Sequence, residues 1–170
     1  FVGLILGLPV FAVIALLIRL DSPGAVIYRH ERIGKDGKTF RLWKFRTMVH
    51  DADEQLVDLM EQDPVLSEEW KANHKLKHDP RITRIGRWLR RSSLDELPQL
   101  VNILVGEMSL VGPRPIVAEE VKHYENGIRL YEKVRPGLSG LWQVSGRSDT
   151  SYRYRVSLDE YYIRHWSIWL

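Results

Sequence analysis

The sequence has 170 residues, a mass of 19.9 kDa, 44% hydrophobic and 28% charged residues, and a net charge of +3. This length suits one domain with its own core, and the composition excludes both intrinsic disorder and a bundle of many membrane spans. The absence of cysteine excludes disulfides, thiolate zinc sites and cysteine nucleophiles, and it fits a reducing compartment.

The first 18 residues are uncharged and almost wholly apolar. As a helix they would measure about 27 Å, close to the thickness of the apolar part of a bilayer. Pro9 lies in the middle of this run, where it removes a backbone donor and kinks the helix. Two interpretations follow: a kinked spanning helix, or a re-entrant helix over residues 1–20 that turns at Pro9 and leaves by the same face. A cleaved signal peptide and a buried core helix fit the run less well.

The residues around this segment suggest its setting. Because the sequence opens at Phe1 inside an apolar run and without an initiator Met, we expect it to be a fragment of a longer chain. Arg19 and a basic region follow the apolar run, so both of its ends are predicted to lie on the cytosolic side. The rest of the chain, residues 21–170, is then predicted to form one domain that faces the cytosol.

A β-hairpin is predicted after the turn residues at 21–24. Two short strands surround the dipeptide Asp36-Gly37, which favours a tight turn. In the second strand, residues 39–46, basic side chains alternate with apolar ones, which places Lys44 and Arg46 to face an anion. Residues 52–77 then have a helical pattern that Pro64 interrupts.

Basic residues gather in two stretches. Seven lie between Arg29 and Arg46 and eight between Lys71 and Arg91, whereas the charged residues from Asp51 to Glu69 are all acidic. The second stretch contains an amphipathic helical pattern whose arginines surround an apolar stripe of Ile82, Ile85, Trp88 and Leu89. Such a helix suits an anionic membrane surface, a phosphate group or a nucleic-acid groove. The apolar opening segment argues against nucleic acid.

A pair of carboxylates, Asp95 and Glu96, follows this stripe at the predicted start of another helix. One interpretation is structural, because Ser93 and Glu96 have the spacing of a capping box. The other is catalytic: Asp95 would attack phosphorus and form an acyl-phosphate, while Glu96 would bind a metal, donate or accept a hydrogen bond, or cap the helix. A negative substrate beside carboxylates requires cations, either Mg²⁺ or nearby Arg and Lys.

Two further segments could bind a substrate. Arg114 lies between prolines in Gly112–Pro115, a stiff setting that offers its guanidinium to phosphate, or a rigid turn with a solvated Arg. Residues 137–146 form a Gly-punctuated loop with Trp142 and Gln143 inside it and Arg147 after it, suited to a base or a sugar. Near the end, one broad helical face carries aromatic residues that suit either a membrane boundary or a core: Tyr161, Tyr162, Trp166 and Trp169.

With these residues in view, the chain resembles the bacterial sugar transferase family, the polyprenyl-phosphate hexose-1-phosphate transferases, and among them the undecaprenyl-phosphate galactose phosphotransferases. The matching segments run from the Pro9 region to Trp169. They are Lys44–Met48, Asp79–Thr83, Ser92–Leu97, Met108–Pro115, Arg135–Gly137 and Gly140–Arg147. Several such segments in the same order are more specific than any one of them.

The resemblance implies an enzyme of the cytosolic face of the bacterial inner membrane, α+β and mainly helical, with a re-entrant helix broken at Pro9, interfacial amphipathic helices and a small β-hairpin. It implies that Asp95 and Glu96 are a catalytic dyad that also binds Mg²⁺, and that Asp95 carries a covalent phosphosugar. UMP then leaves, and undecaprenyl phosphate accepts the phosphosugar. Five basic residues match family motifs and are expected to bind substrate phosphate: Lys44, Arg46, Arg90, Arg114 and Arg147.

The expected partners are therefore a UDP-hexose, with galactose favoured over glucose, undecaprenyl phosphate and membrane lipid, with no nucleic acid, and a homo-oligomer is compatible with the sequence. The rival interpretation is a membrane-surface binding or scaffold module. That module would use the same basic and aromatic surfaces without chemistry and would tolerate the loss of Asp95.

Overall fold

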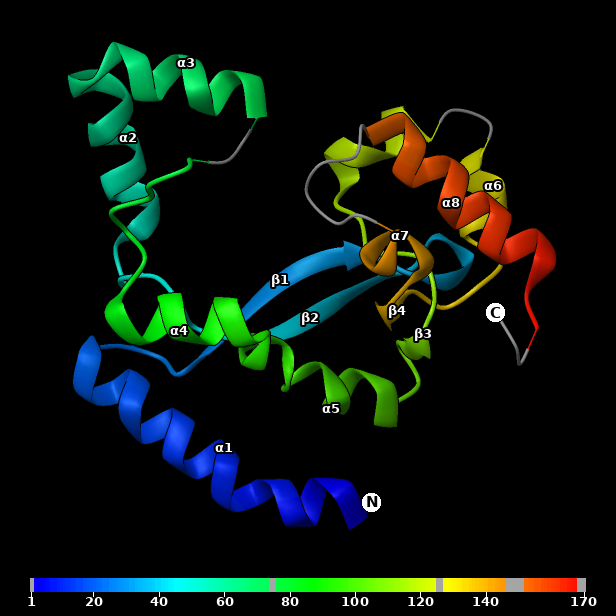
Figure 1. Ribbon diagram of the computed structural model, residues 1–170, viewed down its shortest axis with the longest axis horizontal. Helices are drawn as coiled ribbons and strands as arrows, with labels where there is room; N and C mark the ends of the chain where they lie inside the picture. The colour runs from blue at the N-terminus through cyan, green and yellow to red at the C-terminus, as the bar shows by residue number, and fades with distance from the viewer. Residues whose placement is uncertain (1, 74–75, 125–126, 146–151, 168–170) are drawn as a thin grey trace. The chain divides into compact units, whose positions relative to one another are not determined.

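The computed structural model describes residues 2–73, 76–124, 127–145 and 152–167 (Figure 1). The chain is α+β and mainly helical, as predicted, and it divides into two compact units. The first unit comprises Phe1–Tyr28 and Lys44–Leu97, and the second comprises Arg29–Trp43 and Pro98–Leu170. Both strands of the hairpin pass from one unit into the other, so each unit contains part of it.

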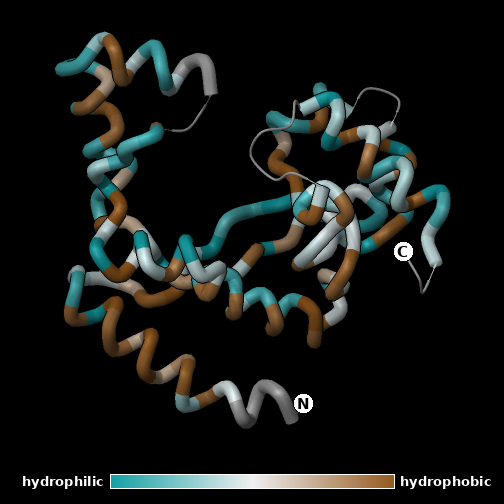
Figure 2. Tube along the Cα trace, in the orientation of Figure 1, coloured by the Kyte–Doolittle hydropathy of each residue, from teal (hydrophilic) through white to brown (hydrophobic). Residues whose placement is uncertain are grey.

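Helix α1 (Val2–Asp21) begins the first unit and continues without a break through Pro9. Ile14 and Ile18 are buried against Phe45 and Leu89, so one side of α1 packs into the core of this unit. Figure 2 shows that the described part of α1 is mostly hydrophobic. Across the described part of the chain, no helix combines the length and apolarity needed to cross a bilayer. The re-entrant arrangement and its boundary at residue 20 stay predictions.

The hairpin follows, with β1 (Ile27–Ile33) and β2 (Thr39–Phe45) in one two-stranded sheet. Asp36 and Gly37 have φ angles of 59° and 69°, so this dipeptide makes the turn that the sequence predicts. In β2, Phe40, Leu42 and Phe45 are buried, and the basic residues between them are more exposed. The predicted alternation is confirmed.

Helices α2 (Ala52–Gln62) and α3 (Pro64–Asn73) pack against each other and meet at the predicted interruption. Pro64 is the first residue of α3, a position where its missing N–H costs nothing. The Oδ1 atom of Asp63 accepts hydrogen bonds from the backbone N–H groups of Val65 (2.8 Å) and Leu66 (3.2 Å). Asp63 therefore starts α3 by satisfying two of its free donors.

Helix α4 (Arg84–Ser92) is the amphipathic basic helix that the sequence predicts. It begins at Thr83, whose Oγ1 accepts from the backbone N–H of Gly86 at 2.9 Å. Thr83 is itself anchored, because its N–H donates to the carbonyl of Thr47 at 3.1 Å and the neighbouring residues Met48 and Ile82 form an isolated bridge. The segment after β2 thus fixes the start of α4.

The second unit contains a small parallel pair that the sequence analysis missed. Strands β3 (Ser109–Val111) and β4 (Gly137–Ser139) pair in parallel, with Ser109 opposite Gly137. Helix α5 (Gln99–Leu104) precedes β3, and its fully buried Asn102 bonds to β2: the side chain accepts from Trp43 N–H at 3.1 Å and donates to Arg41 C=O at 2.8 Å. The side-chain amide of Asn102 therefore bonds to two backbone groups of β2, one donor and one acceptor.

The remaining elements of this unit are the 3₁₀ turn Ala118–His123 and the helices α6 (Ile128–Tyr131), α7 (Leu141–Val144) and α8 (Tyr152–His165). Their core contains Ile116, Tyr124, Tyr131 and Val156. The prediction of one aromatic face at the end of the chain is wrong for the described residues. Tyr162 is buried in this unit while Tyr161 is exposed, α8 ends before Trp166, and Trp169 lies outside the described residues.

The contact between Gly86 and Thr47 gives a prediction about stability. A Cβ atom added at Gly86 would lie 2.0 Å from the carbonyl oxygen of Thr47, which is backbone and has little freedom to move. Gly86→Ala is therefore expected to lower the free energy of unfolding by about 1–3 kcal/mol, as overpacking does. Gly7→Ala is the control, because its Cβ would be 3.6 Å from the Phe11 ring, an ordinary contact. Chemical unfolding of both variants checks this; equal stabilities would contradict the tight contact.

Candidate functional site

The two candidate catalytic carboxylates lie at a break between helices in the first unit. Ser93 ends α4 with a left-handed φ of 57°, and the 3₁₀ turn Leu94–Glu96 follows it directly. The predicted capping box is wrong, because the Ser93 side chain makes no capping hydrogen bond at this turn. A non-glycine residue with positive φ is uncommon, and such conformations concentrate at functional sites.

Glu96 has a different partner from the one that the capping pattern predicts. Its Oε1 accepts a hydrogen bond from Nζ of Lys44 at 2.7 Å, and the two side chains are each 30% exposed. Lys44 lies on β2, 52 residues earlier in the chain. This ion pair connects β2 of the hairpin to the break after α4.

Asp95 is buried, with 9% of its surface exposed. Burial raises the pKa of its carboxyl group above the usual value, because the charged form loses solvation. Lys44 lowers that pKa, Glu96 raises it, and Arg90 lowers it again. The carboxylate therefore stands among two cations and one anion, a setting in which a negative nucleophile has little water around it.

The structure brings two of the predicted basic residues to this carboxylate and shows a third bonded to the turn after α1. Arg90 donates from Nε to Oγ1 of the buried Thr47 at 2.8 Å, which orients it near Asp95. Arg46 instead donates to the carbonyls of Pro23 and Ser22, the latter at 2.6 Å, in the turn after α1. Lys44 and Arg90 are therefore the cations that act on Asp95, and Arg46 holds a turn.

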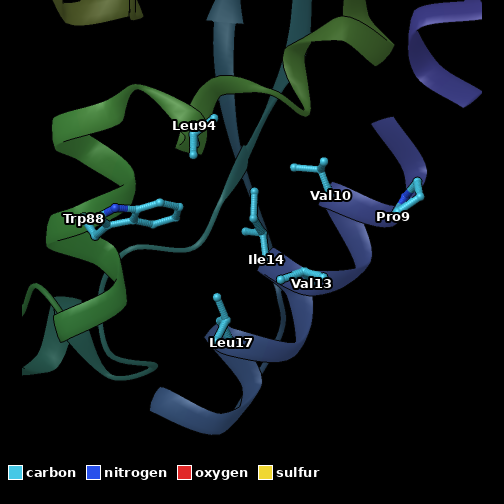
Figure 3. Close-up of a pocket in the computed structure, with 7 residues that line it drawn as sticks. All are labelled: Pro9, Val10, Val13, Ile14, Leu17, Trp88 and Leu94. Carbon is cyan, nitrogen blue, oxygen red and sulfur yellow. The ribbon is translucent and has the colours of Figure 1, made fainter. Parts of the chain in front are cut away.

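An apolar groove of about 270 Å³ adjoins the same break (Figure 3). Its lining comes from α1, α4 and the first residue of the 3₁₀ turn, and Figure 3 shows these side chains around one space: Pro9, Val10, Val13, Ile14, Leu17, Trp88 and Leu94. Leu94 directly precedes Asp95. Leu94 thus lines the apolar groove, and the residue after it carries the candidate nucleophile.

The donor set at the dyad fits magnesium. Mg²⁺ in proteins often takes only one or two carboxylates, with water and substrate phosphates supplying the rest of its coordination. Asp95 and Glu96 offer two adjacent carboxylates, although Lys44 already bonds to one oxygen of Glu96. Within the described residues, no three or more His, Asp or Glu side chains are grouped so that they could hold a metal ion, so an all-protein cage is absent there.

The other predicted binding residues belong to the second unit. The Cζ atom of Arg114 lies 5.5 Å from the centre of the Trp142 ring, so the structure brings these two predicted residues together. Gln143 donates from Nε2 to the carbonyl of Leu138 at 3.4 Å. Arg147 falls outside the residues that the structure describes.

Asp159 of α8 is a buried carboxylate that the sequence analysis missed. It is 2% exposed, and its Oδ2 accepts from the hydroxyl of Tyr124 at 2.8 Å. Burial raises the pKa of Asp159 to about 7, while Tyr124 and the backbone and charge of Arg114 lower it in part. A single Asp inside a helical sequence carries no local signal of burial, so only the packing of α8 reveals it.

The raised pKa of Asp159 gives a prediction about stability and pH. The native state binds a proton that the unfolded state releases near pH 3.8, so the contribution of this group to stability falls as pH rises from about 4 to about 7. Asp159→Asn keeps the shape and stays neutral, so its stability relative to the parent should rise across this window. Urea unfolding at pH 5 and pH 8 measures the change. A relative stability that does not change with pH would show that Asp159 titrates normally.

Comparison with known proteins places the chain in a family. The model of the family described as bacterial sugar transferase matches residues 1–170. The chain is 49% identical over 162 residues to the UDP-galactose-lipid carrier transferase of Erwinia amylovora, covering 95% of this chain and 34% of that protein. It is 51% identical over 146 residues to the undecaprenyl-phosphate galactose phosphotransferase of Salmonella typhimurium, covering 86% and 31%.

A third relative is matched over most of its own length. The exopolysaccharide production protein ExoY of Rhizobium meliloti is 48% identical over 167 residues, which are 98% of this chain and 74% of ExoY. The chain spans about a third of the length of the first two relatives. The match over the whole chain and the identities near 50% show that this chain belongs to the bacterial sugar transferase family.

Proposed function

We propose that this bacterial sugar transferase moves hexose-1-phosphate from a UDP-sugar to undecaprenyl phosphate and so starts the assembly of a surface glycan. Relatives named for UDP-galactose, undecaprenyl phosphate and exopolysaccharide production support this donor, acceptor and pathway class, with galactose favoured over glucose. The observation that carries the proposal is the buried Asp95, with Lys44 and Arg90 acting on its charge and an apolar groove beginning at the preceding residue.

In the first step, a carboxylate oxygen of Asp95 attacks the phosphorus that carries the hexose. The bond from this phosphorus to the oxygen that bridges the two phosphates breaks, and UMP leaves with that oxygen. Asp95 now carries the hexose-1-phosphate as an acyl-phosphate. A weakly solvated carboxylate suits this role, because little water has to be removed before it attacks.

In the second step, a phosphate oxygen of undecaprenyl phosphate attacks the phosphorus held by Asp95. The bond between this phosphorus and the Asp95 oxygen breaks, which releases the carboxylate and forms undecaprenyl diphosphosugar. The enzyme returns to its starting state, so one side chain serves as nucleophile and then as leaving group.

Positive charge must offset the repulsion between the carboxylate and the substrate. One phosphate charge 4 Å from a carboxylate costs about 4 kcal/mol at an effective dielectric near 20, and a diphosphate costs more. In the first unit, Lys44 and Arg90 supply cations where the structure places Asp95. Mg²⁺ held by Asp95 and Glu96 would neutralise further charge when bound. The phosphate-binding roles of Arg46, Arg114 and Arg147 are carried forward from the family motifs.

The acceptor needs an apolar binding surface, and the groove next to Asp95 provides one. Its lining residues are all apolar or aromatic, and an isoprenoid chain is a suitable occupant. With its lipid tail against α1 and Trp88, the acceptor would carry its phosphate toward the residue that follows Leu94. The groove thus supports a lipid-linked acceptor over a soluble one.

The surface of the first unit supports a membrane location. Along α1, apolar side chains that do not pack into the core are exposed, by 58% for Leu8, 58% for Val13 and 75% for Leu20. Such a surface favours lipid over water. The exposed Trp88 and the arginines of α4 suit the boundary with anionic headgroups. We therefore propose that the protein lies at the cytosolic face of the bacterial inner membrane.

Replacement of Asp95 tests the covalent mechanism. Asp95→Asn should lower the release of UMP from UDP-galactose by at least about a thousandfold, because an amide is a poor nucleophile. Intact-mass measurement of the parent protein with UDP-galactose, without acceptor, should show one added hexose phosphate that the variant lacks. The fold should survive, and stability at pH 7–8 should hold or rise, since burial disfavours the charged Asp95. Undiminished UMP release by a folded Asp95→Asn protein would refute the proposal.

Glu96 is predicted to support the reaction through its negative charge, by helping to bind Mg²⁺. Glu96→Gln keeps an acceptor for Lys44 and loses the negative charge, so the variant should require several-fold more Mg²⁺ for half-maximal UMP release. A titration of activity against Mg²⁺ measures this shift, with chelator as the zero point. Glu54→Gln is the matched control, because Glu54 is exposed on α2 and outside the proposed site. An identical Mg²⁺ requirement in Glu96→Gln and the parent would remove Glu96 from the metal site.

A further inference from the structure

Thr47 lies two residues after the end of β2, and its side chain is almost fully buried, with 7% of the residue exposed. Its Oγ1 accepts a hydrogen bond from Nε of Arg90 on α4 at 2.8 Å. Thr47 belongs to the matched segment Lys44–Met48, in which only the basic residues had a predicted role. A hydroxyl with no predicted role therefore bonds to an arginine that is expected to bind phosphate.

This bond occupies only one of the three nitrogens of the Arg90 guanidinium. Within the part of the chain that the structure describes, the two terminal nitrogens donate to no acceptor, and Arg90 as a whole residue is exposed. Partial burial lowers the pKa of the guanidinium, and the charges of Asp95 and Asp79 raise it in part, so the candidate nucleophile lies near enough to act on it. Two terminal nitrogens side by side match two oxygens of one phosphate group.

The hydroxyl bond is not needed to hold α4 in place, because backbone contacts already do so. The carbonyl of Thr47 accepts from the N–H of Thr83, at the start of α4, at 3.1 Å. The same carbonyl lies so close to Gly86 within α4 that a Cβ atom there would be 2.0 Å from its oxygen. The effect that belongs to the hydroxyl alone is therefore its effect on the Arg90 head group.

A restrained head group has an advantage in binding. An arginine side chain has several rotatable bonds and loses much of their freedom when it binds a ligand. Thr47 removes part of this freedom beforehand, because its own side chain is buried and β-branched, with few rotamers. A guanidinium oriented in advance also keeps its geometry while charge moves from the nucleophile to the leaving group.

We infer that Thr47 is a positioning residue for the phosphosugar transfer: its hydroxyl orients the guanidinium of Arg90, whose two terminal nitrogens then bind oxygens of a substrate phosphate. The inference rests on the proposed function, because it deepens the role of Arg90 in that reaction. One stretch of chain then serves both cations near Asp95. Lys44 on β2 is itself one of them, and Thr47, three residues later, orients the other.

The rate of UMP release from UDP-galactose, with acceptor present, tests this inference. Thr47→Val keeps the shape of the side chain and removes the acceptor, so it should lower kcat roughly tenfold, the scale of one hydrogen bond to a charged group. Thr47→Ser keeps the hydroxyl and should stay within about threefold of the parent. Thr39→Val is the matched control and should leave kcat unchanged, because Thr39 is exposed at the start of β2 and its side chain makes no hydrogen bond among the described residues.

A double-mutant cycle with Arg90→Met separates orientation of Arg90 from general damage. Arg90→Met removes the group that Thr47 orients, so adding Thr47→Val should lower kcat by less than about a further twofold. A full tenfold further loss would show that Thr47 acts independently of Arg90. An equal loss in Thr47→Ser and Thr47→Val would assign the effect to packing. Either result, or an undiminished kcat in Thr47→Val, overturns the inference.

Proton exchange of the Arg90 Nε–H group, followed by NMR of the detergent-solubilised protein, needs neither turnover nor a Thr47 variant. In the parent, this group should exchange at least about tenfold more slowly than that of Arg91, which is exposed and whose side chain makes no hydrogen bond among the described residues. Thr47→Val should abolish the difference, and Thr47→Ser should keep it. Equal exchange of the two arginines in the parent overturns the inference, even where Thr47→Val does not fold.

The two measurements separate this inference from the proposed function. A parent protein that releases no UMP from UDP-galactose rejects the proposed function, while the exchange of its Arg90 still decides whether Thr47 orients this residue. UMP release that is insensitive to Thr47→Val retains the function and rejects the inference.

Discussion

A carboxylate that is 9% exposed is costly to keep charged, and the first unit is arranged around one such group, Asp95. The cations that offset this cost come from distant parts of the chain, Lys44 from β2 and Arg90 from α4. Arg90 is fixed through the segment after β2, where Thr47 accepts from Arg90 by its hydroxyl and from Thr83 by its carbonyl. The electrostatics of the carboxylate therefore depend on backbone contacts, including the close approach of Gly86 to Thr47.

The break at Ser93 connects this charge to the apolar surface of the unit. In a 3₁₀ turn, neighbouring side chains point about 120° apart, so Leu94 and Asp95 face different surroundings within one turn. Leu94 lines the groove with α1 and Trp88, while Asp95 lies with the cations. Under the proposed function, this alternation is what a lipid phosphate requires, because its tail and its headgroup need opposite environments within a few ångströms.

Local sequence patterns predicted the structure correctly where neighbouring residues determine it. They failed where a residue bonds instead to a distant part of the chain. The turn at Asp36-Gly37 and the helix break at Pro64 are properties of a few neighbouring residues, and the sequence predicted both. The capping pattern at Ser93 was equally local, but Glu96 bonds instead to Lys44, which lies 52 residues away. Arg46 matched a phosphate-binding motif, and that role stays a prediction; its bonds to the turn after α1 are a second role that only the folded chain reveals.

The parallel pair was missed for a related reason. Strands β3 and β4 have three residues each, too short for any alternation to be visible, and each depends on a partner 28 positions away, as for Ser109 and Gly137. Gly137 is required there, because a Cβ atom would lie 2.1 Å from the backbone nitrogen of Gly112. The glycines in these motifs therefore bring two backbones into contact, and that contact fixes the chain on both sides of Arg114 and Trp142.

The packing around Arg114 also contains a buried carboxyl group, Asp159, which lowers the stability of the fold at high pH. A buried carboxyl whose pKa is raised to about 7 weakens the fold above that pH, and an apolar or amide side chain at the same place would avoid the loss. Its contacts explain why such a group is nevertheless useful: it bonds to Tyr124 and lies against the Arg114 backbone, whose carbonyl the hydroxyl of Tyr131 contacts. The network therefore exchanges some stability at neutral pH for a fixed backbone at Arg114, whose guanidinium lies beside Trp142.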